Sequence, residues 1–138
     1  MNASNYLEEK LLDYIFKGES FDITNAYLGL VSSTATTTDL EQGDLTNEIS
    51  GYTGDRKDVL NANFMSAYQD SEEGTTKNQN VIDFEDMPNE EVQYLIVCDS
   101  QTPGSGNILM WSEAPTLRTP ENGDTYRIIE EGFTIKIG

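Results

Sequence analysis

The sequence predicts a mainly β protein, an antiparallel β-sandwich of the jelly-roll type preceded by an N-terminal amphipathic helix. Three observations lead to this fold class. Residues 91–99 form the most continuously apolar stretch, residues 132–137 alternate between apolar and polar side chains, and strong turn signals occur at residues 103–106 and 122–123. One helix followed by seven or eight strands, with long loops early and short turns late, is typical of a sandwich.

The stretch from Glu91 to Asp99 is expected to be the central strand. Because side chains alternate along a strand, one face would carry Val92, Tyr94, Ile96 and Cys98 and the other Gln93, Leu95, Val97 and Asp99. The middle of the stretch is apolar on both faces, which indicates a strand that is covered on both sides. The single cysteine, Cys98, is therefore expected to behave as a small buried hydrophobe.

Residues 4–17 have the pattern of an amphipathic helix. Leu7, Leu11, Tyr14 and Ile15 recur on one helical face, and Gly18 supplies a stop signal. The helix could cover one sheet or contact a neighbouring subunit, and we favour the cover. We accordingly divide the chain into residues 1–18, a helical segment that packs on the domain or on a neighbour, and residues 19–138, the β-sandwich domain.

The remaining elements follow from periodicity and turn signals. The first strand is expected at residues 26–33, and the polar stretches 34–50 and 70–79 are expected to be long loops. Further strands are expected at residues 55–64, 81–84, 107–114, 124–130 and 132–137, the last with Phe133, Ile135 and Ile137 pointing inward.

The charge balance excludes several classes of partner. The chain of 138 residues carries 25 acidic and 8 basic residues, a formal net charge of −17, so it lacks the positive patch that nucleic acid or an anionic membrane surface requires. The N-terminus does not resemble a signal peptide, and no segment has the length and apolarity of a membrane span.

No enzymatic constellation is visible, and we expect neither a cofactor nor a metal. The chain has no histidine, which removes the commonest general base and metal ligand. Asp39, Glu41 and Asp44 offer oxygen ligands for an irregular calcium site, but no loop has the EF-hand spacing, and solvated carboxylates are the simpler interpretation.

Tyr52 and Arg56 stand out in the acidic middle of the chain. An arginine in so acidic a protein will find carboxylates, and a tyrosine at a turn can connect a loop to the core. Two interpretations fit, an intramolecular salt bridge and a subunit contact, and the sequence does not separate them.

Several motifs occur in an order that resembles a known family. They are SNYLEEKLLDYIFKG, AYLGLVSS, Gly51-Tyr52 with Arg56 close behind, NILMWSEA and GDTYRIIEEGFTIKI. The layout is similar to that of small virion proteins of tailed bacteriophages, often labelled tail-fibre-like, with "SNYLE-x-K-LLD" helices. The arginine of the middle motif is displaced in this chain.

The resemblance implies a structural virion protein rather than an enzyme. From it we expect a capsid decoration protein, a homotrimer on the outside of the head that binds the major capsid protein and is made in the host cytoplasm. The alternative is a tail or tail-fibre accessory protein that contacts the host surface. The candidate contact residues are Tyr6, Leu7, Leu11, Tyr14, Tyr52 and Arg56.

Overall fold

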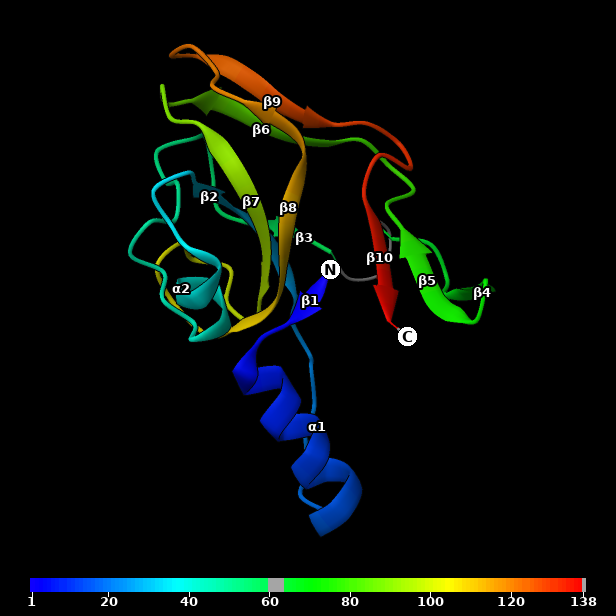
Figure 1. The fold of residues 1–138 in the computed structure, drawn as a ribbon. Helices are drawn as coiled ribbons and strands as arrows, with labels where there is room; N and C mark the ends of the chain where they lie inside the picture. Colours follow the sequence, from blue (N-terminus) through cyan, green and yellow to red (C-terminus); the bar gives the residue numbers. More distant parts are fainter. Residues whose placement is uncertain (60–63, 138) are drawn as a thin grey trace.

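The computed structural model describes residues 1–59 and 64–137. Its elements in chain order are β1 Asn2–Ala3, α1 Asn5–Lys17, β2 Tyr27–Ser32, α2 Thr37–Glu41, β3 Lys57–Asp58, β4 Tyr68–Asp70, β5 Glu73–Lys77, β6 Ile82–Met87, β7 Val92–Cys98, β8 Ile108–Arg118, β9 Asp124–Ile128 and β10 Thr134–Ile137. Figure 1 shows a β body from which α1 projects at one end.

The main sheet is built around β7, as expected from the sequence. Its strand order is β1-β8-β7-β2-β3, and every pairing is antiparallel. One core cluster packs Leu95 and Val97 of β7 on one face, and a second packs Ile96 and Cys98 on the other. An irregular register next to Val92 moves that side chain to the Leu95 face, whereas strict alternation predicted the opposite face.

Two smaller sheets complete the described β structure. Strands β6 and β9 form a pair across the end of the body opposite α1, and β10, β5 and β4 form a three-stranded sheet beside the main one (Figure 1). The prediction of a mainly antiparallel β protein with an N-terminal helix is therefore confirmed. The sheets do not close into a barrel, and the arrangement does not show a jelly roll.

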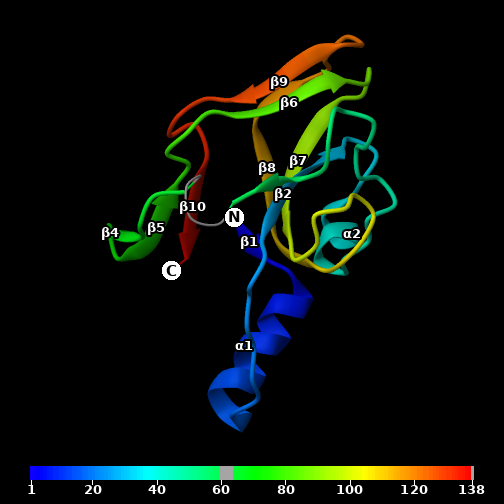
Figure 2. The ribbon, with the colours of Figure 1, turned by 180° about the vertical axis from the view of Figure 1, so that it is seen from behind.

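Helix α1 does not cover a sheet, so our favoured prediction for it was wrong. The buried Ser4 caps the helix, its hydroxyl accepting a bond from the Leu7 N–H and donating one to the Ile108 carbonyl, and Gly18 ends the helix in the left-handed conformation. Only Leu7 is buried among the helical residues. Both ribbon views show the rest of α1 extending beyond the body, with the chain returning alongside it (Figures 1 and 2).

Both predicted long loops contain regular structure. Residues 34–50 include α2, whose Thr36 and Asp39 form a reciprocal capping box, and residues 70–79 include β5. Of the strand expected at residues 55–64, the described residues form β3 and a bridge at Phe64, and residues 60–63 lie outside the described part. Phe133 is buried and Ile135 packs against the core as expected, but Ile137, the last residue of β10, is exposed rather than inward-facing.

Candidate functional site

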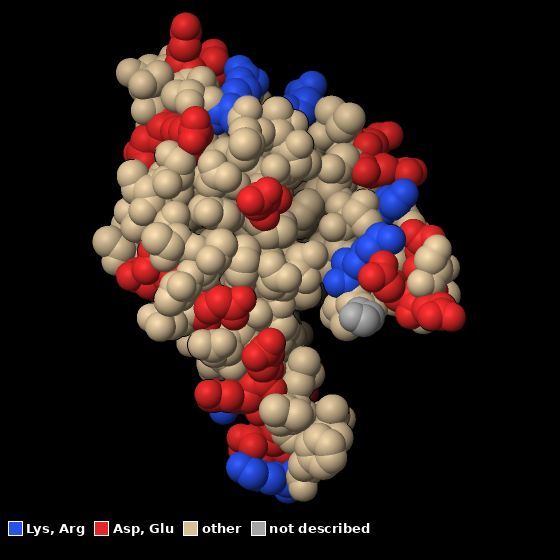
Figure 3. All heavy atoms as spheres, in the orientation of Figure 1, with Lys and Arg blue, Asp and Glu red and all other residues tan. Residues whose placement is uncertain are grey.

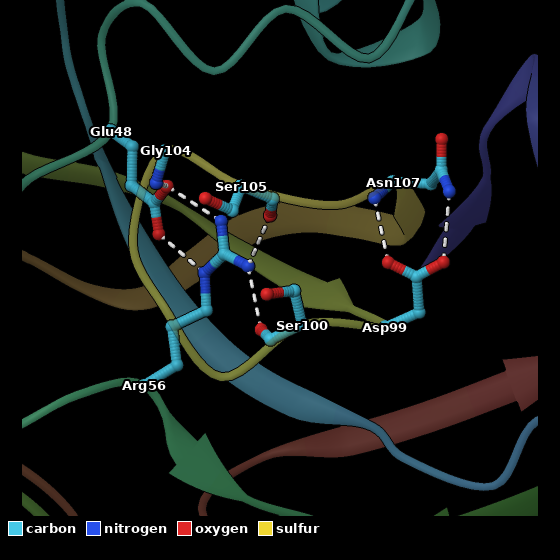
Figure 4. A network of polar contacts seen from close by, with 7 residues as sticks. All are labelled: Glu48, Arg56, Asp99, Ser100, Gly104, Ser105 and Asn107. Carbon is cyan, nitrogen blue, oxygen red and sulfur yellow. Dashed lines mark hydrogen bonds and ion pairs between the residues drawn. The ribbon is translucent and has the colours of Figure 1, made fainter.

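Arg56 lies in a buried polar centre between β2 and the loop of residues 99–107 that joins β7 to β8. Its guanidinium makes a bidentate pair with Glu48, Nε to Oε1 and Nη2 to Oε2 both at 2.7 Å (Figure 4). The side chains of Arg56 and Glu48 are 0% and 2% exposed. Although burial disfavours the charged form of Arg56, the hydrogen bonds that it donates to Glu48 help to raise its pKa. The structure therefore shows the intramolecular salt bridge.

The same centre fixes the loop of residues 99–107. Arg56 Nη1 donates to the carbonyl oxygens of Ser100 at 2.7 Å and Ser105 at 2.8 Å, and the Gly104 N–H donates to Glu48 at 2.6 Å. At the loop base, the Asp99 carboxylate accepts two bonds from Asn107 (Figure 4). The salt bridge thus provides hydrogen-bond partners for backbone groups of the loop that do not pair with a strand.

Gly29 on β2 makes room for this pair. A Cβ atom at position 29 would lie 2.8 Å from Glu48 Oε1 and 3.3 Å from Arg56 Nε. A glycine inside a strand allows another group to approach closely, and here the groups that approach are buried charged side chains. A Glu at position 48 gave no signal of this role, because it lies in a stretch of similar acidic residues.

Tyr52 is buried and is not available as an exposed aromatic contact. Its ring packs edge-on against Phe84 at a centroid distance of 5.0 Å, and Lys57 Nζ lies 5.6 Å from its centroid. Within the described residues its hydroxyl has no hydrogen-bond partner, and burial raises its pKa. Tyr52 is therefore part of the core in the isolated chain.

In helix α1 the polar side is covered and most of the apolar side is exposed, which is the opposite of the usual packing of an amphipathic helix. The segment 19–25 returns along its polar side, where Tyr6, Lys10 and Asp13 are half-buried. Its large apolar side chains are exposed instead: Leu11, Leu12, Tyr14, Ile15 and Phe16, from 42% for Leu11 to 78% for Phe16. In Figure 3 the arm carries charged atoms along one side and uncharged atoms along the other. Of the four predicted contacts on α1, Leu11 and Tyr14 are therefore exposed, Tyr6 is half-buried and Leu7 is buried.

Sequence reasoning missed the hairpin of β4 and β5, which lies at the far side of the body (Figure 1). Asp70 pairs with Glu73, so the connection is the two-residue turn Ser71-Glu72, with φ of 53° and 75°. Such turns strongly favour Asn and Gly, so two side chains are held here in a disfavoured conformation. The neighbouring Tyr68 is exposed.

The three carboxylates considered for calcium have separate protein partners. Asp39 accepts from the Thr36 N–H, Glu41 from Trp111 Nε1 and Asp44 from Thr46. In residues 1–59 and 64–137, no three His, Cys, Asp or Glu side chains are grouped to hold a metal. No described helix is long and apolar enough to cross a membrane.

The β body thus carries a projecting arm whose exposed apolar side offers a surface for contact with other molecules. The chain belongs to the family of the podophage GP4 fiber I protein gp80, which it matches over residues 2–136. A comparison with curated proteins found no significant match. The family confirms the resemblance to phage virion proteins and the prediction that the protein is structural and not an enzyme.

The family also corrects part of the functional prediction. It is a fibre family, so it favours the tail-fibre alternative over the capsid decoration protein that we expected. Membership implies a virion component whose partners are other virion proteins, and it does not single out the major capsid protein or the outside of the head.

Proposed function

We propose that the protein is a component of the phage tail fibre that contacts the host surface. The observation that carries this proposal is the match to a fiber I family over nearly the whole chain. The β body suits an exposed role, because its polar loop of residues 99–107 is fixed by the Arg56–Glu48 centre rather than left free. A preorganised surface loses less conformational entropy when it binds.

Within the body, the β4–β5 hairpin is the element we assign to the host contact. It combines an exposed aromatic side chain, Tyr68, with the conformationally strained turn Ser71-Glu72. Lys136 on β10 pairs with Asp70 at 3.1 Å and Glu73 at 3.2 Å and so supports the base of the turn. An aromatic ring on a supported hairpin is a suitable binding group, since it buries a large area at small entropic cost.

Location can be tested by counting copies of the protein in purified virions by quantitative mass spectrometry. A tail-fibre component should be present in the low copy number of tail proteins, far below the major capsid protein. A copy number of the same order as the capsid protein would contradict the proposal, and so would absence from the particle.

Host contact can be tested with phage that carry Tyr68→Ser. We expect the affinity of reversible adsorption to host cells to fall about tenfold, the loss of roughly 1.4 kcal/mol of binding free energy. The matched control is Val81→Ser, because the two side chains have similar exposure, 39% and 42%, and lie in different parts of the chain. Equal adsorption by the two variants would remove the hairpin from the host contact.

The division of the chain at residue 18 stays a prediction, and so does the homotrimer expected from the sequence, which competes with the dimer proposed below and is decided by the same measurement. The N-terminal segment contributes β1 to the main sheet and the buried side chains of Ser4 and Leu7 to the interior. Deleting it would therefore damage the fold, and its role is better tested by substituting exposed residues of α1.

A further inference from the structure

The exposed apolar side of α1 needs a partner. At 3.6 residues per turn, Leu7, Leu11, Leu12, Tyr14, Ile15 and Phe16 cover an arc of about 200° of the helix circumference. Leu7 packs into the core, and the return segment lies against the polar side, so the part of the arc formed by Leu11, Leu12, Tyr14, Ile15 and Phe16 stays open. A surface helix in a monomer buries its apolar side, so the reversed burial of α1 marks an interface.

We propose that the occupant of this face is α1 of a second copy of the chain, packed antiparallel. The proposal concerns assembly and does not depend on host contact by the hairpin. It rests on the distribution of charge along the chain and on the size of the exposed apolar surface of α1.

Charge distribution favours contact through α1. The helix holds three acidic and two basic residues, a net charge of −1, so the rest of the chain carries −16 of the total −17. Two such bodies repel each other, and α1 is an arm of low net charge that extends away from the body (Figure 3). Copies can therefore meet through their arms with little opposition from like charges.

The direction of pairing follows from the same charges. An antiparallel pair places the two bodies at opposite ends of a 13-residue helix, about 20 Å long, which is more than two Debye lengths at physiological ionic strength. Glu8 lies within the apolar arc near the N-terminal end, between the positions of Ile15 and Leu12 on the helical wheel. Parallel pairing would bring Glu8 of each copy together, whereas antiparallel pairing sets it opposite the apolar C-terminal turn.

The apolar area fits a weak, reversible pair. Five side chains that each present roughly 100 Å² give about 500 Å² per copy, or about 1,000 Å² in the complex. This lies at the lower end of specific interfaces, so we expect a dissociation constant in the micromolar range. Higher salt should strengthen the pair, because it screens repulsion between the acidic bodies and does not weaken apolar contact.

The first test is sedimentation equilibrium of the full chain across the micromolar range. We expect a monomer–dimer equilibrium in the wild type and a dimer weakened at least about tenfold in Leu12→Gln/Phe16→Gln, which keeps helix propensity. Leu117→Gln is the matched control, an exposed leucine on β8, and should dimerise as the wild type does. A wild-type monomer throughout, a trimer, or a dimer unaffected by the helix substitutions would overturn the proposal.

The second test fixes the direction by disulfide trapping. Cys98 is buried and is not accessible for a disulfide between chains, so any such disulfide comes from the introduced cysteines. When Glu8→Cys and Ile15→Cys chains are mixed and oxidised, antiparallel pairing should give mainly the mixed disulfide. Formation of Glu8→Cys homodimers in preference to mixed ones would show parallel pairing and refute the arrangement. Both tests use purified protein, so their failure would leave the fibre location and the adsorption experiment unaffected.

Discussion

Neutralising Glu48 by Glu48→Gln should be among the most damaging single changes in this protein. The substitution keeps the size of the side chain but replaces one carboxylate oxygen with an NH2 group. In the wild type the carboxylate accepts bonds from Arg56 Nε, Arg56 Nη2 and the Gly104 N–H, all of which are donors. The new NH2 group therefore faces a donor wherever it points, and a fully buried guanidinium loses its counterion.

The expected cost is about 3–5 kcal/mol, the usual result of removing one partner of a buried pair. This is a large fraction of the total stability of a domain of this size, about 5–15 kcal/mol. Urea unfolding followed by the fluorescence of Trp111 and by circular dichroism measures the difference, provided that the slope of the transition is unchanged.

The chain supplies its own control in Asp83→Asn. Arg127 makes the same bidentate contact with Asp83, at 2.7 and 2.8 Å, but their side chains are 58% and 27% exposed. Loss of a solvent-exposed pair should cost less than about 1 kcal/mol. If Glu48→Gln and Asp83→Asn destabilise the protein equally, burial does not decide the strength of the Arg56 centre and our reasoning is refuted.

A double variant separates the charge pair from the loop it holds. Replacement of both charges by apolar groups, Glu48→Leu with Arg56→Met, is often harmless for a simple buried pair. Here it would leave the carbonyls of Ser100 and Ser105 without their donor, at about 1–3 kcal/mol for each unsatisfied group. We expect the double variant to remain at least about 2 kcal/mol below the wild type, and full recovery would mean that the loop does not need Arg56.

Three further predictions concern other positions. Gly29→Ala should lower the free energy of unfolding by about 1–3 kcal/mol, because the new Cβ overpacks against the buried Glu48 carboxylate. Gly74→Ala should cost less, because its Cβ would meet only an ordinary contact at 3.6 Å. Equal effects of the two substitutions in urea unfolding would refute the steric argument. The hydrogen bond that Arg127 donates lowers the pKa of Asp83 in the folded protein. The pair therefore stabilises the fold fully at pH values above the pKa of an unfolded aspartate, about 3.9. This stabilisation is lost as the pH falls through the lower pKa of the folded state. The stability gap between wild type and Asp83→Asn should therefore close in strong acid, and a gap that persists there has another cause. Burial raises the pKa of the Cys98 thiol to about 12, so a thiol reagent in mildly alkaline buffer should label it only after unfolding, and rapid labelling of the native protein would contradict its burial.

The central strand was predictable because its own residues determine its environment. A strand with apolar side chains on both faces is stable only where both faces are covered, and β7 occupies such a position in the middle of the main sheet. Helix α2 and strand β5 were not predicted, because their residues are mostly polar and form regular structure through a capping box and pairing with β10. The one sequence signal that indicates α2 is the spacing of Thr36 and Asp39, which is that of a capping box.

The candidate sites divide in the same way. The amphipathic pattern of α1 predicted an apolar face, but which side the return segment would cover depends on tertiary structure that periodicity does not encode. Arg56 was singled out as the rare cation of an acidic stretch, and an intramolecular salt bridge was one of its two interpretations. Glu48 and the loop carbonyls could not be named, because the partners of a long side chain are set by contacts up to 49 residues away in sequence.

The pairing of β1 with β8 sets the order of events when the protein is made. Asn2 lies opposite Trp111, so the first strand of the chain cannot join the sheet until residue 111 has been synthesised. At about 5–20 residues per second this takes roughly 5–20 s, during which the apolar arm has emerged while its attachment point does not exist. The arm of residues 5–17 therefore leaves the ribosome well before the strand that anchors its base. Copies made from one messenger RNA would therefore have their arms free for the pairing proposed above before their bodies have folded.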